Sequence, residues 1–130
     1  MAGPALLDLV YPVDTRDRTW MPDGLCRKNH PDTPAKAWSC DESEKVVIAG
    51  ATVTAYRAQK AAVGVCFSCP AQWDCARFAV EGAEECGVWG MIMRDLRWLL
   101  ASGLDGVALI EGARKRGVPV QVMVGRLRTR

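Results

Sequence analysis

Cysteine is the residue type whose spacing in this chain points most directly to chemistry. Three of the six cysteines lie close together, at positions 66, 69 and 75, in the pattern C-x2-C-P-x4-C. Two cysteines separated by two residues can turn both sulfurs toward one centre, because that spacing allows a tight turn or the first turn of a helix. A fourth ligand must then come from elsewhere, and the candidates are Cys26, Cys40, Cys86 and the single histidine, His30.

An iron–sulfur cluster fits this spacing better than a structural zinc site. Structural zinc sites generally use two close pairs of ligands, and this chain has one such pair. A cluster accepts a compact trio and one distant cysteine, because each iron needs a single protein thiolate and sulfide supplies the other bonds. Zinc bound by Cys66, Cys69, Cys75 and either Cys26 or His30 is the first alternative.

A thiol–disulfide oxidoreductase is a second alternative, since Cys66 and Cys69 form a C-x-x-C pair. The pair lacks the βαβ context in which this motif carries a thioredoxin-like role. The sequence also contains no Ser-His-Asp set, paired carboxylates or phosphate-binding loop, and a single histidine excludes most hydrolytic sites. We therefore expect no enzyme and no small-molecule substrate.

The chain is expected to stay in the cytoplasm. Its apolar run ALLDLV is interrupted by an aspartate and follows no basic segment, unlike a signal peptide. No uncharged apolar stretch approaches the roughly 20 residues that cross a bilayer as a helix, so no membrane is expected as a partner. In a reducing compartment cysteines are usually metal ligands or redox-active, which disfavours a secreted scaffold of three disulfides.

Basic residues gather at the C-terminal end. Residues 112–130 contain six basic side chains and no acidic one, so this end carries +6 while the whole chain carries +2. An acidic body with a basic end is the charge pattern of a protein that meets a polyanion, here expected to be DNA. A solvated end without a partner is the alternative. The candidate DNA contacts are Arg114, Lys115, Arg116, Arg126, Arg128 and Arg130.

The first 40 residues are rich in proline and aspartate and predict loops with at most short helices. A helix is predicted to begin at Asp41, where Glu44 completes a variant of the capping box. Apolar residues at positions 46, 49, 53, 56 and 63 then follow helical spacing, although Gly50 weakens this helix by roughly 1 kcal/mol relative to alanine. This helix would deliver the chain to Cys66.

Two shorter amphipathic helices are predicted after the C-x2-C pair. Pro70 suits the first turn of a helix that contains Cys75 and ends at Gly82. The next helix follows residue 90 and ends near Gly103. Their apolar faces contain Trp73, Ala76 and Val80 in the first helix and Ile92, Leu96, Leu99 and Leu100 in the second.

The conformation of residues 104–130 is left open by the sequence. The first half is helix-like, whereas the valines of residues 118–124 alternate as in a strand. The segment ARKRGVPV partly resembles an AT-hook, with Val118 in place of the second arginine. Ala113 and Gly117 also fit the outline of a helix-turn-helix motif, although several glycines in this segment disfavour well-formed helices. Either geometry would use the arginines mainly for phosphate contacts.

Taken together, these motifs resemble the WhiB-like (Wbl) proteins of actinobacteria and their phages. The resemblance covers about residues 20–100 and consists of Trp20 shortly before the cysteine of GLCR, the C-x2-C-P-x4-C run, a short helix and the turn GVWG. It implies a mainly α fold, a small helical domain organised around a four-cysteine [4Fe-4S] cluster, with a basic C-terminal tail. The implied organisation is a flexible segment 1–19, a cluster-binding domain 20–103 and a DNA-contacting segment 104–130.

On this resemblance the cluster ligands are Cys26, Cys66, Cys69 and Cys75. Cys40 and Cys86 fall outside the motif and are expected to be partly buried small apolar residues. The 39 residues between Cys26 and Cys66 keep Cys40 as a rival fourth ligand.

The resemblance also implies a transcriptional regulator that binds the C-terminal region of the primary sigma factor. The matching partner-binding residues are Trp20, Gly87, Val88, Trp89 and Gly90. Trp89 could instead pack into the core. The family's turn usually ends in a second glycine, where this chain has Met91; a positive φ there would strain the methionine, so the turn is expected to differ.

The expected switch is loss of the cluster. Thiolate-bound iron is open to attack by nitric oxide or oxygen, and the released thiols can pair as disulfides. Because metal binding is coupled to folding in small domains, loss of the cluster is expected to loosen the N-terminal loop together with the partner surface.

Overall fold

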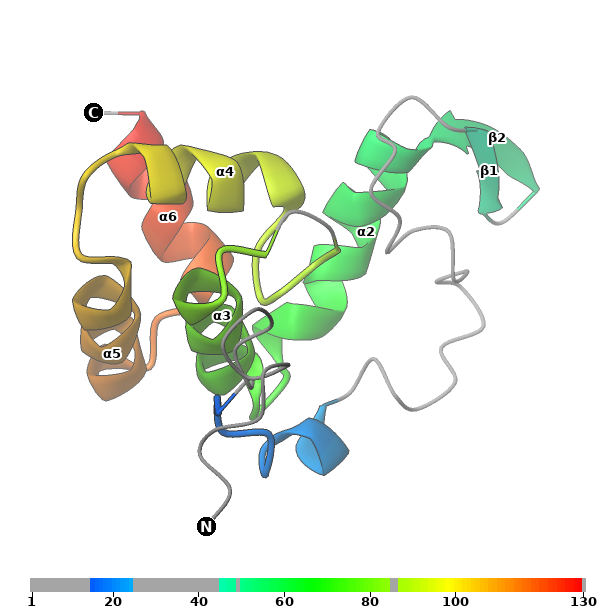
Figure 1. The fold of residues 1–130 in the computed structure, drawn as a ribbon. Helices are drawn as coiled ribbons and strands as arrows, with labels where there is room; N and C mark the ends of the chain where they lie inside the picture. The colour runs from blue at the N-terminus through cyan, green and yellow to red at the C-terminus, as the bar shows by residue number, and fades with distance from the viewer. Residues whose placement is uncertain (1–14, 25–44, 49, 85–86, 130) are drawn as a thin grey trace, which may run out of the picture.

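The structure is a computed structural model that describes residues 15–24, 45–48, 50–84 and 87–129. It is mainly helical, as predicted, with one small antiparallel sheet in addition (Figure 1). The elements in chain order are η1 (Met21–Asp23), β1 (Lys45–Ile48), β2 (Ala51–Thr54), α2 (Ala55–Phe67), α3 (Gln72–Glu81), α4 (Met93–Ala101), α5 (Gly106–Arg116) and α6 (Val120–Arg128). Among the described residues, no helix is long and apolar enough to cross a membrane.

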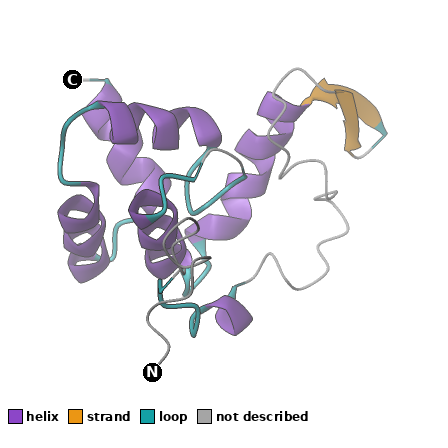
Figure 2. Cartoon of the chain, viewed as in Figure 1, coloured by secondary structure: helices purple, strands orange, loops and turns teal. Residues whose placement is uncertain are grey.

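The prediction of one helix from residue 41 through Val63 is wrong for residues 45–48 and 50–54, while position 49 lies outside the described residues. These residues form the hairpin β1–β2, in which Val46 lies opposite Val53, and the helix begins only at Ala55. Gly50, at φ +80°, supplies the left-handed conformation that a two-residue hairpin turn requires. The capping residues Asp41 and Glu44 lie outside the described residues. The hairpin extends from the N-terminal end of α2 (Figure 2).

The helices predicted on either side of the GVWG turn are confirmed, except that α3 begins at Gln72 and Pro70 precedes it instead of lying in its first turn. α3 ends where expected, with Gly82 as its C-cap, and Gly103 follows the end of α4 with a φ of +78°. Leu96 and Leu99 are buried as predicted, whereas Leu100 is 38% exposed and lies at the edge of the apolar face. The main errors of the helix prediction therefore lie before residue 55.

The C-terminal segment forms two helices, α5 and α6, rather than a strand. Gly117 adopts the left-handed conformation and ends α5, and the turn through Pro119 leads directly into α6. Val120 and Val124 are fully buried one helical turn apart, so the apparent alternation of valines is a helical stripe. The helix-turn-helix outline thus describes the path of the chain.

One hydrophobic core joins α3, α4, α5 and α6. Its buried members are Ala76, Ala79, Met91, Leu96, Leu99, Ile110, Val120 and Val124. Residues 106–128 are therefore integral to the packing of the domain. Burial of their apolar side chains offsets the helix-weakening effect of the glycines within them.

Candidate iron–sulfur site

The end of α2 and the start of α3 bring three cysteines together. Cys66 lies in the last turn of α2, Cys69 follows in the connecting turn, and Cys75 lies in the first turn of α3. The N–H of Cys69 donates to the carbonyl of Cys66 at 3.1 Å, and the N–H of Cys75 donates to the carbonyl of Ala71 at 2.8 Å. Cys66 and Cys69 are buried and Cys75 is half-buried, so backbone hydrogen bonds fix the chain around all three thiols.

These three cysteines line one cavity, as the spacing predicts. The remaining residues around the cavity are Trp20, Gly24, Val65, Ala71, Gln72, Val88 and Gly90. Gly24 belongs to the N-terminal part of the chain and precedes the predicted fourth ligand, Cys26, by two residues. Cys26 and its rivals His30, Cys40 and Cys86 lie outside the described residues.

The donor set fits an iron–sulfur cluster. Within the described ranges, no three Cys, His, Asp or Glu side chains lie close enough together to bind one metal ion. A cluster does not require that closeness, because each thiolate binds a different iron and the sulfur ligands surround the cluster from separate sides. Three cysteines around a shared, mainly apolar cavity, with no Asp, Glu, Lys, Arg or His in its lining, suit such a group.

Gln72 is a central residue of the site that the sequence did not reveal. Its side chain is 3% exposed, and its amide nitrogen donates to the carbonyls of Phe67 and Cys69 at 3.2 and 3.3 Å. Its amide oxygen accepts the N–H of Val120 at 3.0 Å. One side chain therefore joins the cysteine turn to the first residue of α6. A glutamine at the start of a helix carries no sequence signal for such a role.

The GVWG turn covers the cavity from another side. Gly87 and Gly90 both have positive φ, at +99° and +76°, and a Cβ on Gly90 would come within 2.7 Å of the carbonyl of Gln72. Met91 is fully buried and is not among the described residues with positive φ, so the missing second glycine costs no backbone strain. The turn therefore packs its backbone directly onto the start of α3.

The predicted partner-binding residues are only partly accessible. Val88 and Gly90 are buried, whereas Gly87, Trp20 and Trp89 are half-buried. The rings of Trp20 and Trp89 both contact Phe78, edge-on at 5.7 Å and stacked at 5.6 Å between centroids. Both tryptophans thus pack within the domain and still expose part of their indoles.

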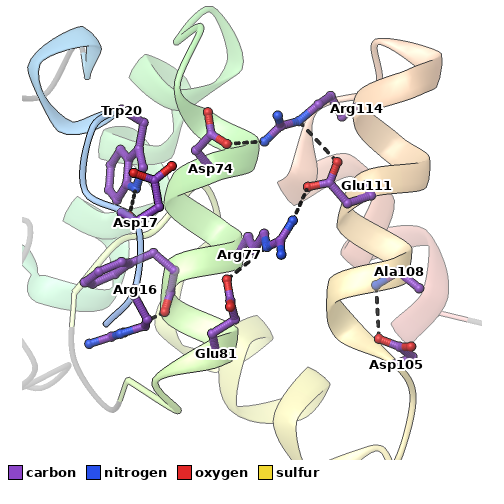
Figure 3. A network of polar contacts seen from close by, with 11 residues as sticks. Arg16, Asp17, Trp20, Asp74, Arg77, Glu81, Asp105, Ala108, Glu111 and Arg114 are labelled. Atoms are coloured by element: carbon purple, nitrogen blue, oxygen red, sulfur yellow. Dashed lines mark hydrogen bonds and ion pairs between the residues drawn. The ribbon is translucent and has the colours of Figure 1, made fainter. Parts of the chain in front are cut away.

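An ion-pair network ties α3 to α5 (Figure 3). Arg114 pairs with Asp74, the neighbour of Cys75, and Arg77 pairs with Glu111 at 3.4 Å and with Glu81 at 2.9 Å. Hydrogen bonding to Glu81 raises the pKa of Arg77 above its ordinary value, with a smaller contribution from Glu111. Each pair is partly exposed and contributes little alone; the network fixes the register of the two helices.

A second network holds α6 against α4. Asp95 is 4% exposed and accepts hydrogen bonds from Gln121 and Arg128. The side-chain oxygen of Gln121 in turn accepts the N–H of Ile92 at 2.8 Å, just before α4. A buried carboxylate is thereby satisfied by two donors from one helix.

The predicted DNA contacts fall into two groups. Arg114 and Arg128 form the ion pairs with Asp74 and Asp95. Lys115, Arg116 and Arg126 are exposed. Arg116 and Arg126 also line an open groove between α5 and α6, whose other walls include Gly112 and Met123. Arg130 lies outside the described residues.

Comparison with known proteins assigns the chain to a family. A family model described as "Transcription factor WhiB" matches residues 20–100. The chain is 31% identical over 114 residues to "Transcriptional regulator WhiB4" of Mycobacterium tuberculosis, in two strains; the alignment covers 86% of this chain and 81% of the relative. No solved structure matches. Members of this family generally bind an iron–sulfur cluster and regulate transcription. With three cysteines gathered at one cavity beneath a GVWG turn and this match over most of its length, the chain belongs to the WhiB family of transcription factors.

Proposed function

We propose that this transcriptional regulator carries a [4Fe-4S] cluster bound by Cys26, Cys66, Cys69 and Cys75. The observation that carries the proposal is the cavity that Cys66, Cys69 and Cys75 share, which Gly24 also lines. Since consecutive Cα atoms are 3.8 Å apart, the Cα of residue 26 can lie at most about 7.6 Å from that of Gly24, so a thiol at position 26 is able to reach the cavity. Cys40, which lies further along the chain, has no comparable constraint.

The protein residues prepare this site for a cluster and shield it. The buried residues Val88 and Gly90 and the half-buried Val65 line the cavity and limit the access of water from one side. When bound, the cluster supplies iron that reacts with nitric oxide or oxygen. Because Gln72 hydrogen-bonds both the cysteine turn and Val120, displacement of that turn is expected to move α6.

The proposed partners are the C-terminal region of the primary sigma factor and DNA, in the cytoplasm. The exposed parts of Trp20 and Trp89 beside the cavity offer aromatic contacts of the kind that dominate protein interfaces. Lys115, Arg116 and Arg126 offer exposed positive charge for phosphate contacts. No catalytic role is proposed for any residue.

Iron and sulfide analysis of anaerobically purified protein tests the cluster. We expect about four irons and four acid-labile sulfides per chain, with visible absorbance that Cys26→Ser, Cys66→Ser, Cys69→Ser and Cys75→Ser each abolish and that Cys40→Ser and Cys86→Ser retain. Zinc without sulfide would favour the structural zinc site instead. Loss of colour in Cys40→Ser but not in Cys26→Ser would reassign the fourth ligand.

The switch is tested by sigma-factor binding before and after treatment with nitric oxide. We expect the affinity of the loaded protein to fall when its cluster is destroyed, because the surface beside the cavity loses its support. Unchanged affinity after complete loss of visible absorbance would reject the switch and leave the cluster assignment intact.

A further inference from the structure

The N-terminal end of the described chain contacts α3 mainly through Arg16, and the guanidinium of Arg18 also lies 5.1 Å from the centroid of the Phe78 ring. We call residues 15–24 the leader. Within it, the guanidinium of Arg16 donates to the carbonyl of Phe78 at 2.6 Å, lies 3.6 Å from the centroid of the Phe78 ring and pairs with Glu84 at 3.0 Å. Its side chain is only 18% exposed. Hydrogen bond, cation–π contact and ion pair therefore converge on a single, largely desolvated group.

The position of this arginine is favourable for a cation. Phe78 lies in the last turn of α3, whose carbonyls carry the partial negative charge of the helix dipole. The carbonyl of Phe78 already accepts the N–H of Gly82 at 3.1 Å, so Arg16 adds a second, charge-assisted hydrogen bond and interacts favourably with the dipole. The contact site of Arg16 on α3 is therefore present in the helix itself and includes none of the proposed cluster ligands.

Gly82 leaves the space that Arg16 occupies. A Cβ at position 82 would overlap the guanidinium of Arg16. The φ of Gly82 is −94°, which any residue adopts, so the backbone conformation does not require glycine there. Glycine is therefore needed at the end of α3 because a larger residue would displace Arg16 and with it the leader.

A second contact, made by Trp20, links the part of the leader at Arg16 with the part that lines the cysteine cavity. The ring of Trp20 lies edge-on to Phe78, and its indole N–H donates to the carbonyl of Asp17 at 2.8 Å. Trp20 and Gly24 both line the cavity of Cys66, Cys69 and Cys75. Phe78 therefore sits between the leader and the turn that contains Trp89, and the leader spans the distance from the end of α3 to the proposed cluster.

We infer that Arg16 is a positioning residue for the cluster: it docks the leader on α3 independently of iron and so holds the chain at the cavity before the cluster is bound and after it is lost. This inference rests on the proposed function only for the identity of the bound group. It changes the expected switch, because the loosening that follows cluster loss would begin after Gly24 rather than at the start of the leader.

Hydrogen–deuterium exchange of the full chain, as purified without oxygen and after iron removal by a chelator, tests the inference. We expect the hydrogen-bonded amides of the leader, those of Thr19, Met21 and Gly24, to be protected in both states of the wild type. In Arg16→Ala and Gly82→Ala they should exchange roughly tenfold faster or more, the effect of losing a charged hydrogen bond. Gly64→Ala, where a Cβ meets nothing within 4 Å, is the matched glycine control, and Arg57→Ala, an exposed arginine on α2, is the matched arginine control.

Protection of α3 and α4 in the same samples shows whether each variant is folded. In the loaded protein, Arg16→Ala and Gly82→Ala should also lose visible absorbance several-fold faster under a chelator than either control. Protection of the leader that appears only in the iron-loaded wild type would overturn the inference, because the cluster and not Arg16 would then hold the leader. Equal exchange in wild type and Arg16→Ala, or an iron-free chain without protected helices, would overturn it as well. A chain that binds no iron would refute the proposed function yet leave the exchange test of Arg16 valid.

Discussion

The side-chain oxygen of Gln72 accepts the backbone N–H of Val120 at 3.0 Å, 48 residues away in the sequence. The same glutamine donates to the carbonyls of Phe67 and Cys69. A single buried amide group thus connects the turn that carries two proposed cluster ligands with the helix that carries proposed DNA contacts. The first prediction concerns this connection.

Replacing Gln72 with leucine should lower the free energy of unfolding by about 1–3 kcal/mol, because the buried N–H of Val120 loses its partner. Chemical denaturation followed by circular dichroism measures this change. Thr129→Val, which removes hydrogen bonds at the exposed end of α6, should cost less than about 0.5 kcal/mol. Equal stability of Gln72→Leu and wild type would show that water accepts the Val120 N–H in the variant.

Arg128 and Arg126 should differ in their effects on stability. Removing Arg128 leaves the carboxylate of Asp95, whose side chain is 6% exposed, with Gln121 as its remaining described donor. Breaking a fully buried pair costs roughly 3–5 kcal/mol, and because Arg128 is 39% exposed we expect about 1–2 kcal/mol for Arg128→Ala. Arg126→Ala should change stability by less than about 0.5 kcal/mol. Denaturation midpoints that shift equally would contradict this division.

In DNA binding the order is reversed: replacing Arg126 should weaken binding more than replacing Arg128. Removing an arginine that binds one phosphate is expected to reduce the slope of log affinity against log salt by about 1. We therefore expect Arg126→Ala to bind a DNA duplex more weakly with a shallower slope, and Arg128→Ala to keep the wild-type slope. Fluorescence anisotropy at several salt concentrations provides the measurement. A shallower slope for Arg128→Ala would mean that its pair with Asp95 opens on DNA.

Ala83→Gly should stabilise the protein by roughly 1 kcal/mol. Ala83 has a φ of +47°, and the N–H of Glu84 donates to the carbonyl of Ala79 at 2.9 Å, so α3 ends in a Schellman motif with alanine where glycine is favoured. Thermal unfolding measures the gain. Gly64→Ala, within the exposed side of α2, should stabilise by a similar amount through helix propensity. Destabilisation by Ala83→Gly would mean that the positive φ is not retained in solution.

The turn formed by Asp17 and Thr19 within the leader should weaken in acid. The carboxylate of Asp17 accepts the N–H and hydroxyl of Thr19, and the backbone hydrogen bond foremost holds the pKa of Asp17 below its ordinary value of 3.8. A carboxyl group with a lowered pKa stabilises the folded form above the ordinary pKa and loses this contribution as the pH falls through the lowered value. The Thr19 amide signal in NMR spectra should therefore begin to shift below about pH 4. Asp17→Ala should show the shifted signal at neutral pH.

Periodicity predicted α3 and α4 well because both helices bury one continuous apolar face, with Leu96 and Leu99 on that of α4. It failed for residues 45–48 and 50–54, where apolar residues happen to recur at helical spacing. The run KVVI and the run ATVT are rich in β-branched residues on either side of Gly50, and that composition, rather than the spacing, describes the hairpin.

The gathering of Cys66, Cys69 and Cys75 at one cavity could be predicted because the three cysteines lie within ten residues of one another. The contacts of Gln72, Arg16 and Asp95 could not, because each joins residues that are far apart in the sequence and none belongs to a motif. Likewise, the charge of Arg114 and Arg128 suggested DNA, whereas only the packing of α5 and α6 brings them to Asp74 and Asp95.

The burial of Val120 and Val124 among α3, α4 and α5 has a practical consequence for protein engineering. A C-terminal region of this kind cannot be exchanged as a unit. Grafted onto a paralogue, its buried apolar side chains would lose their packing partners, and so would those of the recipient's core. Chimaeras that test the proposed DNA contacts should therefore exchange single exposed side chains of α5 and α6 and retain their buried faces.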